Sequence, residues 1–169
     1  MGIFSGWFGK KTTAATTTDP LLEALRAAYP AGPFRRGVIG DVHAATAISD
    51  ILIFAGDDHW LLVFVGAVDL VVRVPKSASP PTWPIEPVTR VAEAVVAGAE
   101  IREGTTWIIG EALSPFAGFI TVAAPTLSTS TAPVWQLVLV TAAELAGDTQ
   151  TLLQTVRADE ARLTATVST

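Results

Sequence analysis

The chain of 169 residues is long enough for one domain with a full-sized core and leaves little for a second domain. Half of the residues are apolar and 16% are charged, yet no apolar run reaches the roughly 18 residues of a membrane-spanning helix. The formal net charge of −5, with acidic groups scattered along the chain, argues against a nucleic-acid surface and suits a basic partner. The absence of cysteine excludes disulfides and thiolate metal sites.

Residues 1–18 are expected to form a flexible N-terminal segment. This segment has an aromatic cluster followed by two lysines, but it lacks the long apolar core and cleavage site of a secretory signal. Two interpretations of the cluster stay open: a frayed terminus, which the pattern favours, and a weak peripheral contact with a membrane. The cluster consists of Ile3, Phe4, Trp7 and Phe8.

The first helix is predicted to begin at Asp19 and Pro20, which serve as N-cap and first-turn proline. Leucines at helical spacing supply its apolar stripe, and the helix is expected to end near Tyr29. The segment after it contains Arg35 and Arg36 and is expected to be a loop.

Three strands are predicted next, each rich in β-branched and aromatic residues and bounded by turn residues. Their expected ranges are Ile48–Phe54, His59–Val65 and Val68–Val74. Gly56–Asp58 is expected to form the first turn, and Gly66 permits a bend or bulge before the third strand. A meander of three neighbouring strands is the simplest arrangement.

A strand, a proline-rich turn and a helix follow one another from Asp69 to Ala97. Pro75 ends the strand because it has no N–H for a ladder, and Pro84 suits the first turn of the helix. Trp83 lies between prolines and is expected to fill the junction of sheet and helix. Arg73 is the one charge in an apolar strand, which favours a structural ion pair with a nearby carboxylate.

The C-terminal part is predicted to add three strands, a short helix and a final helix. The strands are expected at Thr105–Ile109, Gly118–Ala123 and Val134–Val140. Thr141 and Glu144 form a capping box for the short helix, and Asp148 caps the last one. Residues 159–169 are expected to be a loose tail. Together the elements predict an α+β fold over residues 19–158, with a mixed, mainly antiparallel sheet packed with about four helices.

The turn Gly56–Asp58 and the strand His59–Val65 that follows it provide the candidate site. Trp60 is predicted to be a partly exposed aromatic anchor for a partner, with Asp57, Asp58 and His59 as its polar rim. The same three polar residues fit an enzyme with a bound metal or a general base, although a solvated hairpin turn explains them better. Since no catalytic, nucleotide or metal-ligand motif is present, we predict no catalytic residues, metal or cofactor.

Several of these pieces, in this order, resemble the suppressor of fused domain. The likeness is carried by the strand Asp69–Pro75, by the sequence Pro80–Pro84 that leads into a helix, and by Thr141–Leu145 after an apolar strand. It spans about Asp19 to Arg157. On this basis Asp69, Arg73, Trp83 and Pro84 are interpreted as structural residues of the fold.

The resemblance implies a non-enzymatic protein-binding module. Animal members of the family restrain transcription factors by holding a short peptide as an added strand between two domains, and only one domain is expected here. Stand-alone bacterial members are thought to be immunity proteins that neutralise toxins. We therefore expect a cytoplasmic, bacterial immunity-type protein whose partner is another protein, such as a basic toxin. The alternatives are a metal-dependent enzyme built on Asp57, Asp58 and His59, and a peripheral membrane scaffold.

Overall fold

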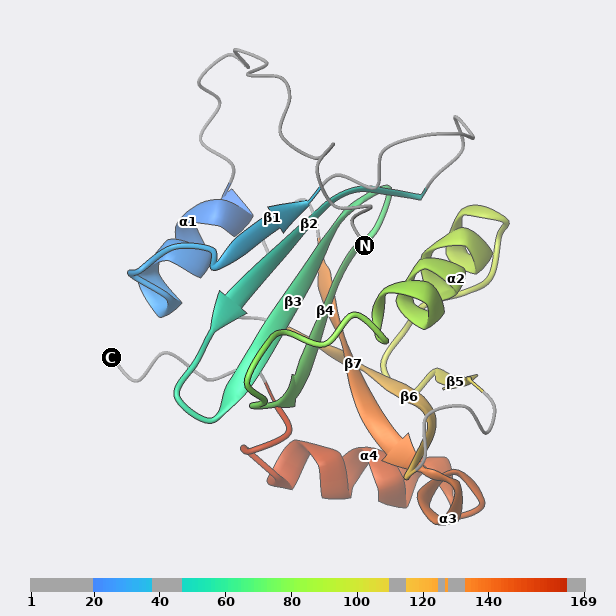
Figure 1. Ribbon diagram of the computed structural model, residues 1–169. Coiled ribbons are helices and arrows are strands. Elements are labelled where there is room, and N and C mark those ends of the chain that lie inside the picture. Colours follow the sequence, from blue (N-terminus) through green and yellow to red (C-terminus); the bar gives the residue numbers. More distant parts are fainter. Residues whose placement is uncertain (1–19, 38–46, 110–114, 125–126, 128–132, 164–169) are drawn as a thin grey trace, which may run out of the picture.

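The computed structural model describes residues 20–37, 47–109, 115–124, 127 and 133–163 (Figure 1). This part of the chain contains four helices and seven strands, which confirms the predicted α+β class. In chain order they are α1 (Pro20–Ala28), β1 (Arg35–Gly37), β2 (Ile48–Ala55), β3 (His59–Gly66), β4 (Asp69–Pro75), α2 (Ile85–Val96), β5 (Thr106–Ile108), β6 (Phe116–Ala123), β7 (Val134–Thr141), α3 (Ala142–Leu145) and α4 (Thr149–Ala158).

The strands form one sheet in the order β1-β2-β3-β4-β7-β6-β5. Strands β4 and β7 pair in parallel and every other neighbouring pair is antiparallel, which confirms the prediction of a mixed, mainly antiparallel sheet. The expected meander is confirmed as β2, β3 and β4. Because consecutive β-strands joined by tight turns pair side by side, this half of the sheet follows directly from the sequence pattern.

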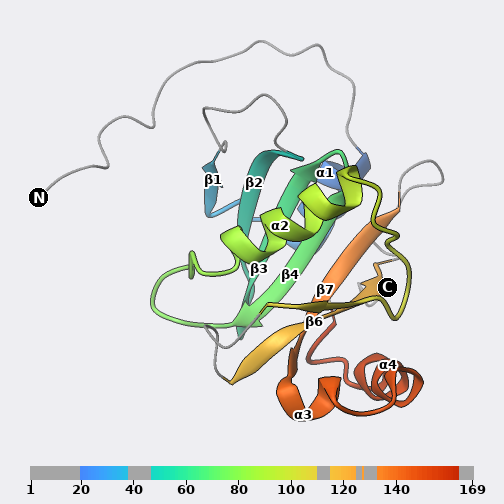
Figure 2. The ribbon, with the colours of Figure 1, turned by 90° about the vertical axis from the view of Figure 1, so that its right-hand side faces the viewer.

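Helices cover both faces of the sheet (Figures 1 and 2). On one face α2 packs through Val88, Val91 and Ala92 against a core that includes Phe64 and Phe119. On the other face α1 covers the half with β2, β3 and β4, and α4 covers the half with β6 and β7. Strand side chains alternate between these faces, so the central strands are buried on both sides.

The sheet opens between its two halves. The parallel ladder of β4 and β7 has three pairs and ends at Val71 and Gln136, whereas β4 runs on to Pro75 and β7 to Thr141. Beyond that point each strand stays paired with its other neighbour, and Figure 1 shows β4 and β7 spreading apart. We call this opening the sheet split.

Two sequence expectations differ from the structure. The segment with Arg35 and Arg36, expected to be a loop, forms β1 and pairs with the edge of β2. The residues of β1 have no strong preference for strands. The strand forms because the backbone groups at this edge of β2 need hydrogen-bond partners. The Phe34 N–H, for example, donates to the Ile53 carbonyl at 2.7 Å. The tail expected to be loose from residue 159 contacts the sheet as far as Leu163.

Gly66 occupies the bend that the sequence predicts. The pairing of β2 with β3 shifts register between Ile48 and Asp50, opposite Gly66. A β-carbon at Gly66 would lie 1.9 Å from the Ala47 carbonyl oxygen. Only glycine therefore permits the two backbones to approach this closely at the bulge.

Candidate functional site

An apolar groove lies between the N-terminal half of α2 and the edge strand β5. Its volume is about 490 Å³. The lining residues are Trp83, Glu86, Pro87, Arg90, Val91, Trp107, Ile108 and Ile109. We call it the α2–β5 groove; its walls are apolar and aromatic, while Glu86 and Arg90 form an exposed ion pair on its helical side.

Strand β5 is the last strand of the sheet, and in the described part of the chain no strand pairs with its outer edge. The Thr105 carbonyl accepts from the Thr121 N–H, and the Ile109 N–H donates to the Ala117 carbonyl, so these groups point at β6. Because backbone groups alternate along a strand, the N–H and C=O groups of Thr106 and Ile108 point to the outer edge. That edge is a template for one more strand.

Apolar side chains accompany this open edge. Ile108 is 85% exposed, the highest fraction among the large hydrophobic residues that are exposed in the described chain. Trp107 is partly buried beside the α2 core, and its indole N–H donates to the Thr121 hydroxyl at 2.9 Å. The groove therefore combines a free backbone edge with aromatic and aliphatic contact area, the two elements of peptide recognition by strand addition.

No sequence pattern points directly to this site. Thr105–Ile109 was predicted as a strand, but its position at the sheet edge depends on the order of all seven strands. Trp83 was expected to fill the sheet–helix junction. It is partly buried against that core, and it also forms one wall of the groove.

Trp60 is not a partly exposed anchor: that prediction is wrong, because only 4% of it is exposed. Its indole N–H donates to the Ser77 carbonyl at 3.1 Å, and the Lys76 ammonium lies 3.9 Å from the ring centre. Phe34, which is 58% exposed, packs against it with the ring centres 5.1 Å apart. Because β3 is an inner strand of the sheet, Trp60 is part of the core that packs against α2. The polar residues beside Trp60 in the sequence do not indicate this burial.

His59 is buried and links two elements. Its Nδ1 lies 2.7 Å from Asp58 Oδ1, and its Nε2 lies 2.7 Å from the Tyr29 hydroxyl at the end of α1. Because a carboxylate only accepts, Nδ1 donates to Asp58. Gly56 leaves room for this ring, since a β-carbon there would lie 2.2 Å from His59 Cε1.

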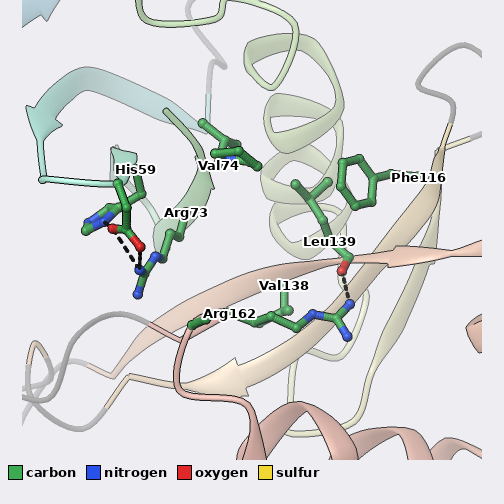
Figure 3. Close-up of a pocket in the computed structure, with 10 residues that line it drawn as sticks. His59, Arg73, Val74, Phe116, Val138, Leu139 and Arg162 are labelled. Atoms are coloured by element: carbon green, nitrogen blue, oxygen red, sulfur yellow. Dashed lines mark hydrogen bonds and ion pairs between the residues drawn. The ribbon is translucent and has the colours of Figure 1, made fainter. Parts of the chain in front are cut away.

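The predicted ion pair of Arg73 is confirmed. One Arg73 nitrogen lies 3.2 Å from each oxygen of Asp58 (Figure 3). The hydrogen bond from His59, followed by the charge of Arg73, holds the pKa of Asp58 below its usual value. Asp57 is exposed to solvent. Of the three residues predicted as a polar rim, Asp57 is therefore a solvated carboxylate, and Asp58 and His59 bond each other.

Asp69 and Pro84, the other two residues interpreted from the sequence as structural, lie at the start of β4 and just before α2. The Asp69 carboxylate accepts from the Gly66 N–H at 3.2 Å and closes the turn between β3 and β4. Pro84 is buried and is the N-cap of α2. Neither residue lines the α2–β5 groove.

The titration of Tyr29 tests the burial of its side chain in the folded protein. Burial, reinforced by the negative charge of Asp58 and opposed by Arg73, raises the pKa of Tyr29 above 10.0. Because it is the one tyrosine of the chain, absorbance titration reports it alone. We expect a midpoint above 10 in the folded protein and near 10 in denaturant. The associated stability is complete below pH 10 and is lost as the pH rises through the folded pKa. Equal midpoints would contradict the burial of Tyr29.

Among the residues that the structure describes, no group of three or more histidine, aspartate and glutamate side chains is arranged to hold a metal ion. Nor is any described helix long and apolar enough to cross a membrane. The aromatic cluster at Ile3, Phe4, Trp7 and Phe8 lies outside the described residues.

No protein-family model and no curated protein matches the sequence. The arrangement of the sheet and helices defines an α+β fold of the suppressor-of-fused type. It is shared with a crystal structure from Neisseria gonorrhoeae FA 1090 described as "Putative SUFU (suppressor of fused protein) homolog". The TM-score is 0.65 and the identity is 14%, over 82% of this chain and 87% of that chain. This likeness confirms the predicted fold.

Proposed function

We propose that this protein is a non-enzymatic binding module that recognises an extended segment of a partner protein in the α2–β5 groove. The observation that carries the proposal is the open edge of β5 beside the groove, with Ile108 exposed on it. The shared fold with the Neisseria protein and the family resemblance of the sequence support the same class of function.

The geometry defines the chemistry of the bound segment. A strand added to β5 would bond the outward backbone groups of Thr106 and Ile108. Its side chains would point alternately toward α2, against Trp83 and Trp107, and toward the opposite face, beside Ile108. The segment would therefore carry apolar residues on both faces over a few positions.

A pair of matched variants tests the site. Ile108→Lys places a charge on the open edge, whereas Val96→Lys places the same charge at the exposed C-terminal end of α2, outside the groove. Both side chains are more than half exposed, so we expect both variants to keep the melting temperature of the wild type. Ile108→Lys is expected to weaken the partner complex at least about tenfold, a loss of about 1.4 kcal/mol, and Val96→Lys to leave it unchanged. Equal binding by the two variants would contradict the proposal.

The finer proposal is that the partner is a toxin and that this protein neutralises it in the bacterial cytoplasm. The net charge of −5 supports a basic partner, because opposite charge speeds encounter. Genes encoded beside this one provide the candidates for capture. Wild type and Val96→Lys should restore growth of cells that express the captured partner, and Ile108→Lys should fail; a captured partner without toxicity would refute this finer proposal alone.

An enzyme built on Asp57, Asp58 and His59 is less well supported. Asp58 and His59 bond each other, and their remaining polar atoms bond Arg73 and Tyr29. The peripheral membrane scaffold depends on Ile3, Phe4, Trp7 and Phe8. Deletion of residues 3–11 would abolish vesicle binding if the scaffold interpretation is correct, and unchanged vesicle binding would refute it.

A further inference from the structure

The aromatic cluster near the N-terminus has the side-chain pattern that the α2–β5 groove requires. Residues 1–19, which contain it, lie outside the described part of the structure. In an extended chain, successive side chains point to opposite faces. The cluster would then present Ile3 and Trp7 on one face, and Phe4 and Phe8 on the other. A strand added to β5 needs apolar side chains on both faces, and this segment of the chain itself supplies them.

Helix α1 starts toward the end of the sheet at which β5 begins. Leu21, in the first turn of α1, belongs to the same core cluster as Ala124, which follows the last residue of β6. At that end of β6 the Ala123 N–H donates to a carboxylate oxygen of Glu103 at 3.4 Å, and Glu103 precedes Thr106, the first residue of β5. A chain that leads into α1 can therefore approach β5 from its Thr106 end.

The connection between the cluster and α1 is long enough for this path. It consists of residues 9–19. At about 3.3 Å per residue, these residues span up to about 36 Å when extended. Helix α1 covers β2, β3 and β4, toward the opposite edge of the sheet from β5 (Figure 1). A strand added outside β5 would lie about 29 Å from β2, because strands are spaced about 4.8 Å apart.

The approach from this end also determines the orientation of the added strand. It would run antiparallel to β5, with Phe8 beside Thr106. The two lysines that follow the cluster would then lie at the end where Glu100 and Glu103 precede β5. Each of these glutamates already pairs with an arginine, so the opposite charges favour the antiparallel orientation and add little affinity.

We propose that the aromatic cluster of Ile3, Phe4, Trp7 and Phe8 adds to β5 as an antiparallel strand within the same molecule and competes with the partner for the α2–β5 groove. The contact is autoinhibitory. This inference rests on the proposed function, because the groove must accept an extended chain. Its main test uses no partner, so the two proposals can fail separately.

Occupation of the groove by the cluster is partial. A segment tethered by a short connection acts at an effective concentration on the order of millimolar. A single short strand binds weakly, because the pairing of two short strands is marginal in water. With a dissociation constant also on the order of millimolar, about half of the molecules carry the added strand. The Thr106 and Ile108 amides therefore exchange only about twofold more slowly than they would without the cluster.

The test compares the amide spectra of ¹⁵N-labelled wild type and the variant Phe4→Ser/Trp7→Ser/Phe8→Ser, which we call the serine variant. These substitutions remove the apolar contacts of the cluster and keep the two lysines. We expect the Thr106 and Ile108 amides to shift between the two proteins, because the serine variant leaves the edge of β5 free. The wild-type shifts should stay the same over a tenfold range of protein concentration, since the contact lies within one molecule.

Two controls use the same two amides. The matched variant Thr12→Ser/Thr16→Ser/Thr17→Ser also has three substitutions, all in the polar connection, and should keep the wild-type spectrum. A peptide with the sequence of residues 2–11, added to the serine variant, should restore the wild-type shifts with a dissociation constant on the order of millimolar. The same peptide with serine in place of Phe4, Trp7 and Phe8 should not.

Three results would overturn the proposal. In the first, the Thr106 and Ile108 amides have equal shifts in wild type and the serine variant. In the second, the wild-type shifts grow with protein concentration, which would assign the added strand to a second copy of the chain. In the third, the partner binds in the groove, as Ile108→Lys tests, yet binds wild type and the serine variant equally. We expect it to bind the serine variant about twofold more tightly.

Discussion

Gly118→Ala is expected to destabilise the protein by about 3 kcal/mol and to loosen the pairing of β5 with β6. A β-carbon at Gly118 would lie 2.2 Å from the Trp107 carbonyl oxygen and 3.0 Å from a Leu145 methyl. The nearest atom belongs to backbone, so β5 itself must shift to relieve the overlap. Because β5 forms one side of the α2–β5 groove, this substitution should weaken partner binding as well as folding.

Gly147→Ala is the matched control for this prediction. Its β-carbon would lie 3.4 Å from the Glu144 carbonyl oxygen, an ordinary contact. We expect a change within about 0.5 kcal/mol in the free energy of unfolding. Denaturant titration of both variants measures the difference. Equal stability of Gly118→Ala and wild type would contradict the close packing of β5 on β6.

The sequence predicts most of the fold because local patterns determine most of its elements. The capping box of Thr141 with Glu144 and the N-cap Asp148 are confirmed. The ion pair of Arg73 was predictable because a charge in an apolar strand needs a partner. Strand β1 was missed because its pairing depends on the edge of β2, which is a tertiary effect.

The candidate sites were less accessible to sequence reasoning. Trp60 attracts attention among polar residues, yet its place in an inner strand buries it. The groove and the sheet split exist because β7 joins β4 in parallel and leaves β5 at the far edge. Such non-local pairing has no local sequence signal. The same holds for Arg162, which bonds both Glu144 and the Leu139 carbonyl of β7.

The open edge of β5 also predicts a pattern of hydrogen exchange. The Ile109 N–H donates to the Ala117 carbonyl at 2.9 Å, so it should exchange slowly in the free protein. The N–H groups of Thr106 and Ile108 point to the outer edge and should exchange quickly. A strand added by a partner would bond these outward groups and slow their exchange, by about tenfold or more.

Residue-resolved hydrogen exchange at β5, measured with and without the captured partner, therefore tests the account most directly. We predict that the Thr106 and Ile108 amides become protected in the complex, while the Ile109 amide, already bonded to β6, changes little. A stable complex in which Thr106 and Ile108 exchange as quickly as in the free protein would show that the partner binds elsewhere.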